Sequence, residues 1–166
     1  QIDAACDRGL DIACDCYPYT AFSTRIGETT YDDGWLERYR CDYGACVPAE
    51  GKYRGMPCTR EIFDELRRED PECITVCHVM KEADIRTAFR HEKVMLGSDG
   101  LMNNGQGHPR AAGSFPRFLC EFAGKSGLSL FDAVKKMTAD PADRLRLPNK
   151  GRLSIGADAD ITVFDP

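Results

Sequence analysis

The sequence lacks three features that would place it at a membrane or on a nucleic acid. No apolar run approaches the roughly 20 residues that span a bilayer, and no charged-then-apolar signal segment opens the chain. Both charge signs are mixed along the sequence and the net charge is −5, whereas a nucleic-acid partner favours a basic face. We therefore expect a soluble, cytoplasmic protein that binds neither a membrane nor nucleic acid.

Paired Cys-x-x-Cys motifs are also missing, although the chain has nine cysteines. The odd number and the lack of a secretory signal argue against a disulfide framework. Several of these cysteines lie in apolar, strand-like runs, which is typical of buried small residues. These are Cys14, Cys16, Cys73 and Cys77. A cysteine-rich structural or zinc-binding module without catalytic activity remains the alternative.

The length of the chain limits its architecture. With 166 residues and 42% hydrophobic content it can form one packed core, but a whole (β/α)8 barrel takes roughly 200 residues or more. The chain begins at Gln1 rather than Met and ends at Pro166 directly after a strand-like segment. We expect it to be a piece of a longer polypeptide.

Hydrophobic spacing predicts alternating helices and strands. Gly9 ends a first helix and a buried strand follows over 10–19. Residues 22–59 lose this periodicity and form a long, lid-like excursion or insertion. Helices 59–69 and 82–90 then alternate with strands 74–79 and 94–97, which predicts an αβαβ segment in a parallel sheet. Later segments are expected as helices over 115–123, 129–137 and 140–147, followed by two short strands over 151–164.

The predicted strand 94–97 ends in the motif Gly97-Ser98-Asp99-Gly100. A carboxylate at the C-terminal end of a barrel strand occupies the place where α/β barrels build active sites. Asp99 is therefore a candidate catalytic residue. The alternative is that Asp99 only caps the backbone of its own loop, as Asp often does.

Several motifs, taken in order, resemble those of the N-acyl-D-amino-acid deacylase (D-aminoacylase) family, a branch of the metal-dependent amidohydrolase superfamily. The resemblance covers nearly the whole chain and is weakest over 22–59. The motifs are Asp15-Cys16-Tyr17-Pro18-Tyr19 with Ser23-Thr24, Gly97-Ser98-Asp99-Gly100, His108-Pro109-Arg110 with Gly113-Ser114-Phe115-Pro116-Arg117, Leu128 to Thr138 with Pro141-Ala142, and Gly151 to Pro166.

This resemblance implies an α/β fold that is the C-terminal part of a (β/α)8 amidohydrolase barrel. Residues 1–148 would form that part of the barrel. Residues 149–166 would begin the return strands of a small β domain. The missing N-terminal part of the barrel would then be a partner of this chain.

The resemblance also implies an activity, the hydrolysis of N-acyl-D-amino acids by zinc-activated water. Asp99 would be the general acid/base and a candidate ligand of a second metal. Arg110, Tyr17 and Ser23 would hold the substrate carboxylate, and Met80 would line the acyl pocket. Thr87 stands where some members carry an arginine, with Arg86 beside it.

The main zinc ligands of the family have no counterparts in this sequence. The three histidines, His78, His91 and His108, do not match their positions, and the resemblance places the ligands before Gln1. We therefore expect the chain alone to be inactive. A cyclic-amide hydrolase of the dihydroorotase or hydantoinase kind is the enzymatic alternative, although it would not specifically need the Tyr-Pro-Tyr and His-Pro-Arg motifs.

Overall fold

The computed structural model describes residues 1–100, 102–103, 106–107, 109–125 and 127–165, and it divides the chain into two compact units. Unit 1 combines residues 1–18 with 82–166, and unit 2 comprises residues 19–81. The second unit is therefore longer than the excursion predicted over 22–59. Because the chain leaves and re-enters unit 1, the elements on either side of unit 2 are neighbours in space.

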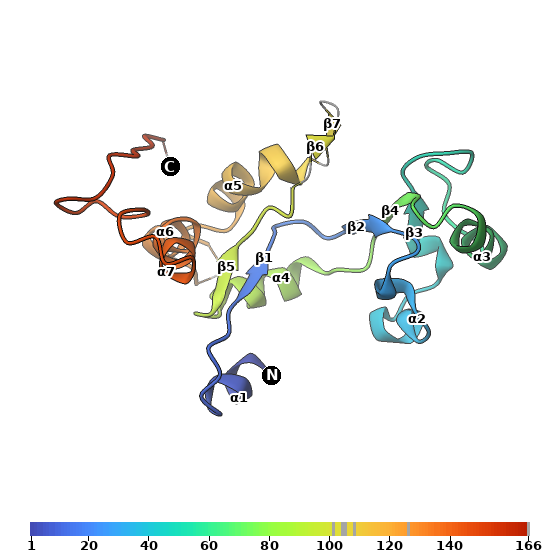
Figure 1. The fold of residues 1–166 in the computed structure, drawn as a ribbon, viewed down its shortest axis with the longest axis horizontal. Helices are drawn as coiled ribbons and strands as arrows, with labels where there is room; N and C mark the ends of the chain where they lie inside the picture. The colour runs from blue at the N-terminus through green and yellow to red at the C-terminus, as the bar shows by residue number, and fades with distance from the viewer. Residues whose placement is uncertain (101, 104–105, 108, 126, 166) are drawn as a thin grey trace. The chain divides into compact units, whose positions relative to one another are not determined.

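Unit 1 is built around a parallel pair of strands, β1 and β5, which lie side by side in Figure 1. Cys14, Asp15 and Cys16 pair with Val94, Met95 and Leu96 in register. Both segments were predicted as strands, and their parallel pairing agrees with the barrel that the family resemblance implies. The elements of the unit are α1 (Ile2–Cys6), β1 (Cys14–Cys16), α4 (Glu82–Arg90), β5 (Val94–Leu96), β6 (Met102–Asn103), β7 (Gln106–Gly107), α5 (Arg110–Glu121), α6 (Leu130–Met137) and α7 (Ala139–Arg144).

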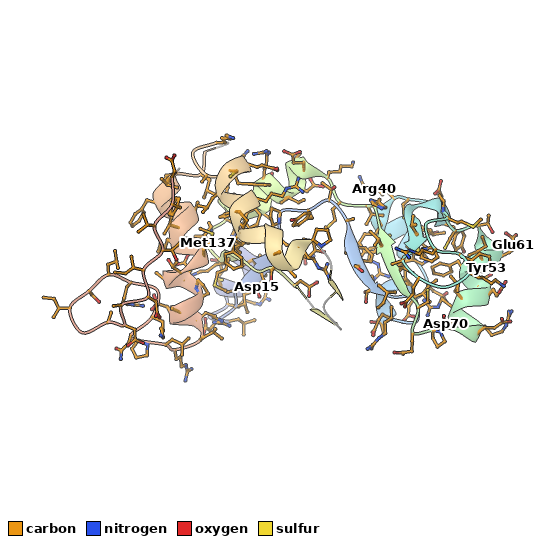
Figure 2. The ribbon with its side chains drawn as sticks, turned by 90° about the horizontal axis from the view of Figure 1, so that it is seen from above. Asp15, Arg40, Tyr53, Glu61, Asp70 and Met137 are labelled. Atoms are coloured by element: carbon orange, nitrogen blue, oxygen red, sulfur yellow. The ribbon has the colours of Figure 1, made fainter. Side chains whose placement is uncertain are left out.

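One face of this strand pair is covered by helices. Phe89 of α4 packs against Phe118 of α5 with ring centroids 4.5 Å apart, and Met137 at the end of α6 joins the same core (Figure 2). Cys14 and Cys16 also pack against this core. Since side chains alternate along a strand, the residues between and after these two cysteines point to the opposite face.

The beginnings of two predicted helices are confirmed by their caps. Thr59 precedes α3 (Arg60–Glu69), and its hydroxyl accepts a hydrogen bond from the Ile62 amide at 3.4 Å. Ser129 precedes α6 and accepts one from the Asp132 amide at 3.0 Å. Such caps satisfy amide groups that have no partner within the helix.

Unit 2 is an antiparallel sheet with the strand order β2-β4-β3, flanked by helices. The parallel arrangement predicted for residues 74–79 is wrong, because β4 is the central strand between two antiparallel neighbours. An apolar run shows that a strand is buried but not which strands pair with it. The elements are β2 (Phe22–Arg25), η1 (Thr29–Tyr31), α2 (Trp35–Tyr39), η2 (Tyr43–Ala45), β3 (Cys46–Pro48), α3 and β4 (Ile74–Cys77).

The core of unit 2 is aromatic and rich in cysteine. Trp35 stacks on Phe63 with centroids 5.2 Å apart, and Tyr31 meets both rings edge-on. Four cysteines are buried in the same core: Cys46, Cys58, Cys73 and Cys77. The predicted burial is therefore confirmed for Cys73 and Cys77, whereas Cys14 and Cys16 of β1 are only partly buried.

The two short strands predicted over 151–164 are not formed. Residues 149–165 contain no strand, and the predicted small-domain boundary at 149 begins an irregular segment. The side chains of Leu153, Ile155 and Val163 are almost fully exposed. Alternating apolar residues specify a strand only when a neighbouring strand supplies hydrogen bonds, and none of the described residues does so here. Within the described residues, no helix combines the length and apolar character needed to cross a membrane.

Candidate functional site

The candidate site lies where the two parallel strands of unit 1 end. The Gly97 amide donates to the Cys16 carbonyl at 2.9 Å, which extends the β1–β5 pairing by one further bond. Because the strands are parallel, Tyr17 after β1 and Asp99 after β5 leave the sheet at the same edge. This is the edge at which α/β barrels place their functional groups.

The Gly-Ser-Asp-Gly turn depends on close approaches at both of its glycines. A Cβ on Gly97 would lie 2.9 Å from the Asp15 Cβ, and one on Gly100 would lie 2.5 Å from the Ala111 Cα. The lack of a side chain at Gly97 therefore leaves room for the Asp15 side chain next to the turn. The second lets the turn lie directly against the first residues of α5.

Within the turn, Ser98 rather than Asp99 caps the backbone. The Ser98 hydroxyl accepts a hydrogen bond from the Gly100 amide at 3.2 Å. Asp99 has a left-handed backbone conformation with φ of 46°, which Asp tolerates better than most residues. Its carboxylate extends to Arg110 instead, so the alternative of a purely local cap is wrong in this structure.

Helix α5 begins earlier than predicted, and this changes the setting of Arg110. The helix starts at Arg110 rather than near Phe115, so residues 110–114, which were predicted to lie outside any helix, are helical. The Gly113 amide donates to the Pro109 carbonyl at 2.8 Å, and Pro116 lies inside the helix. Proline prefers the first turn of a helix, which is why the sequence placed the start too late.

Arg110 joins Asp99 and Tyr17 into one group. Its side chain is only 7% exposed, and Nη2 lies 3.0 Å from Oδ2 of Asp99. The guanidinium carbon lies 5.0 Å from the centre of the Tyr17 ring, within cation–π range. The Asp99 side chain is 66% exposed. A buried cation thus faces an accessible carboxylate and an aromatic ring.

The electrostatics keep Tyr17 protonated. Burial raises the pKa of the Tyr17 phenol above its usual value and the Asp99 charge adds to this effect, while the charge and hydrogen bond of Arg110 act in the opposite direction. The net rise leaves a phenol O–H that can donate a hydrogen bond at neutral pH. The group therefore offers a fixed cation and a hydrogen-bond donor beside a carboxylate.

The remaining predicted site residues lie in unit 2. Ser23 is in β2, opposite Val76 of β4, and the Met80 amide donates to the Thr20 carbonyl at 3.1 Å. The structure therefore brings together Asp99, Arg110 and Tyr17. The roles predicted for Ser23 and Met80 stay predictions.

Asp15 is a further polar residue near this group, and no role was predicted for it. It is labelled in Figure 2, alternates with the core-facing Cys14 and Cys16 in β1, and is exposed. Because residues i and i+2 of a strand share a face, Asp15 lies on the same side of the chain as Tyr17.

Arg86 does not take the place of an arginine at Thr87. Its Nη1 donates to the Glu121 carbonyl at 3.2 Å, and its guanidinium lies over the Phe122 ring at 4.6 Å. Thr87 itself donates to the Ala83 carbonyl within α4. Arg86 therefore ties α4 to α5 beside the core of unit 1.

A metal site is not formed by the described residues alone. No group of three or more His, Cys, Asp or Glu side chains that could hold an ion occurs among them. His91 pairs with Asp3 at 2.8 Å, and His108 lies outside the described residues. The described residues provide no set of partner ligands for Asp99.

The turn at Gly100 yields a first testable prediction. Changing Gly100 to Ala should destabilise the protein by about 1–3 kcal/mol, because the added methyl group meets the backbone of α5. The melting temperature of the intact protein, measured by calorimetry, should fall by several degrees. Ser98→Ala removes only the hydrogen bond within the turn and should have a smaller effect. An unchanged melting temperature for Gly100→Ala would contradict the close approach.

These features define an α/β protein with polar groups gathered at the C-terminal ends of parallel strands. Residues 2–166 match the model of the Amidohydrolase family, so the chain belongs to that family. The predicted resemblance to D-aminoacylases is confirmed by curated relatives from Alcaligenes xylosoxydans xylosoxydans. N-acyl-D-glutamate deacylase is 36% identical and D-aminoacylase 33% identical, each over 99% of this chain. An allantoinase from Enterococcus faecalis is 48% identical over 95% of it.

Solved structures confirm the fold class. N-acyl-D-glutamate deacylase from Bordetella bronchiseptica, solved with zinc and a phosphonate inhibitor, superposes with a TM-score of 0.71 at 28% identity. A D-aminoacylase structure gives a TM-score of 0.73, also at 28% identity. Both matches cover 96% of this chain. The chain spans about a third of the length of these relatives, 34% in each case.

Proposed function

We propose that the protein containing this chain hydrolyses the amide bond of N-acyl-D-amino acids. The observation that carries the proposal is the pairing of buried Arg110 with exposed Asp99 at the ends of parallel strands. The names of the relatives support the substrate class. The residues of this chain would then bind the substrate and move a proton at the amide.

Arg110 would bind the carboxylate of the substrate. A guanidinium presents its donors in a planar fork that matches a carboxylate, and the burial of Arg110 reduces competition from water. The Tyr17 ring holds the guanidinium in place, and its phenol O–H is a donor for the same carboxylate. Ser23 would add a third donor, and Met80 would contact the acyl group.

Asp99 would transfer the proton. Its carboxylate can accept a proton from the attacking water and deliver it to the nitrogen of the departing amine. The Arg110 contact orients the carboxylate, and the accessible position leaves room for substrate beside it. Arg110 would thus bind the substrate carboxylate, and the neighbouring Asp99 would act on the amide bond of the same molecule.

Zinc is the cofactor we propose for the complete enzyme, because a relative was solved with it. The described residues do not form a zinc site by themselves, as the lack of any three-ligand group shows for that part of the chain. We therefore assign no step of the reaction to a metal. The proposal that Asp99 contributes a ligand to a second metal rests on the family resemblance.

A substrate panel tests the proposed activity. The intact protein should release free amino acid from N-acetyl-D-amino acids, with a strong preference over the L enantiomers. Liberated amine can be measured for the D and L forms of several amino acids, with allantoin and hydantoin as cyclic amides. Hydrolysis of the cyclic amides alone would contradict the proposal and favour the cyclic-amide alternative.

A further inference from the structure

Two buried cysteines of unit 2 lie close together without serving the proposed amide hydrolysis. Cys46 begins β3, and Cys58 follows the loop that leaves this strand. The Cys58 amide donates to the Cys46 carbonyl at 2.9 Å. Backbones paired in this way have Cα atoms about 5–6 Å apart, within the range of about 4.4–6.8 Å that a disulfide spans.

The loop between the two cysteines is held by hydrogen bonds both near its base and farther out. Near its base, the Gly55 amide donates to the Pro48 carbonyl at 2.8 Å. Farther out, Tyr53, labelled in Figure 2, donates to Glu65 of α3 at 2.8 Å, and Lys52 contacts the same carboxylate. The loop thus holds the two cysteines next to each other in the folded state.

Cys46 is the more nucleophilic of the two thiols. Its Sγ lies 3.7 Å from the Tyr31 hydroxyl, which in turn lies 2.8 Å from the Thr75 hydroxyl. The hydrogen bond from the Cys58 thiol lowers the pKa of Cys46 to about 7, outweighing the opposite effect of burial. The same contact raises the pKa of Cys58. At neutral pH a larger fraction of Cys46 than of Cys58 is therefore present as the thiolate, the form that attacks peroxide.

We propose that Cys46 and Cys58 form a dithiol that hydrogen peroxide oxidises to an intramolecular disulfide. The Cys46 thiolate attacks one peroxide oxygen, which breaks the O–O bond and gives a sulfenic acid and hydroxide. The sulfur of Cys58 then attacks the Cys46 sulfur, forms the S–S bond and displaces the sulfenic oxygen. In total, two thiols and one peroxide yield one disulfide and two waters.

The surroundings favour Cys58 over other partners. Cys77 is the ladder neighbour of Cys46 across β3 and β4. Burial raises the pKa of Cys77 to about 12 and that of Cys73 to about 11, so both thiols stay protonated at neutral pH. The hydrogen bond from the Cys58 thiol is the largest influence on the pKa of Cys46. Peroxide is hardly larger than water, which suits a site that is 0% exposed at Cys46 and 4% exposed at Cys58.

Peptide mapping by mass spectrometry tests this proposal. Treating the intact protein with hydrogen peroxide should produce a crosslinked peptide joining Cys46 to Cys58 and the loss of two free thiols. Dithiothreitol should restore both thiols. A link between Cys46 and Cys77, oxidation of the exposed Cys120 alone, or no reaction would overturn the proposal.

Two variants identify the order of the steps. In Cys58→Ser, the sulfenic acid at Cys46 should persist and become labelled by dimedone. In Cys77→Ser, a matched change at a fully buried neighbour, the Cys46–Cys58 disulfide should still form. Dimedone labelling of Cys58 in a Cys46→Ser variant at the same rate would contradict the assignment of Cys46 as the nucleophile. The mapping of the unmodified sequence needs neither variant to fold.

Discussion

Replacing Asp99 with Asn is expected to lower kcat for an N-acyl-D-amino acid by about 100- to 10,000-fold. Asparagine has nearly the size of aspartate and retains an oxygen that can accept the hydrogen bond from Arg110, but it cannot take up a proton. Because the Asp99 side chain is 66% exposed, the fold should remain intact. Steady-state kinetics of the intact protein, combined with a thermal melt, measure both quantities.

Asp11→Asn is the matched control for this change. Asp11 also belongs to unit 1 and pairs with an arginine, Arg144, at 2.6 Å, but it lies before β1 rather than after it. Its side chain is 91% exposed, so its ion pair contributes little. The control should retain kcat. Full activity in Asp99→Asn would remove Asp99 from the proposed mechanism.

Replacing Arg110 with Lys should raise KM by about 10- to 100-fold with a smaller change in kcat. Lysine keeps the positive charge but loses the planar fork that binds a carboxylate through two hydrogen bonds. It also loses the flat contact with the Tyr17 ring. Initial rates over a range of substrate concentrations separate KM from kcat.

The control for this second prediction is Arg144→Lys. Arg144 pairs with Asp11 and is 39% exposed, so the same chemical change occurs at an accessible position. We expect its KM to remain at the original value. If Arg110→Lys also left KM unchanged, the assignment of Arg110 to the substrate carboxylate would be contradicted.

Local signals predicted several elements of both units correctly. The caps at Thr59 and Ser129 and the apolar run 94–97 were informative because their physics involves only neighbouring residues. The carboxylate of Asp99 at a strand end followed from the same run. The contact of Asp99 with Arg110 was not predicted, because no local rule joins residues in a turn and a later helix; only the family resemblance assigned both residues to one site.

The elements that were predicted wrongly depend on contacts between residues far apart in the sequence. Strand β4 lies in an antiparallel sheet because β2 and β3 flank it, and the sequence contains no signal for that choice. Residues 151–164 have the alternation of a strand but no neighbouring strand among the described residues. The start of α5 was placed near Phe115 rather than at Arg110, because the close approach of Gly100 to Ala111 joins residues of a turn and a helix and has no local signal.

The most direct test compares an N-acetyl-D-amino acid with the derivative in which its carboxylate has been converted to an amide. It tests whether Arg110 binds the carboxylate of the molecule whose amide bond is cleaved. For the intact protein, kcat/KM for the best N-acetyl-D-amino acid should greatly exceed that for the same compound with its carboxylate converted to an amide. In Arg110→Lys this ratio should fall by about 10-fold or more. The same ratio in the unmodified protein and in Arg110→Lys would contradict the binding of the substrate carboxylate by Arg110.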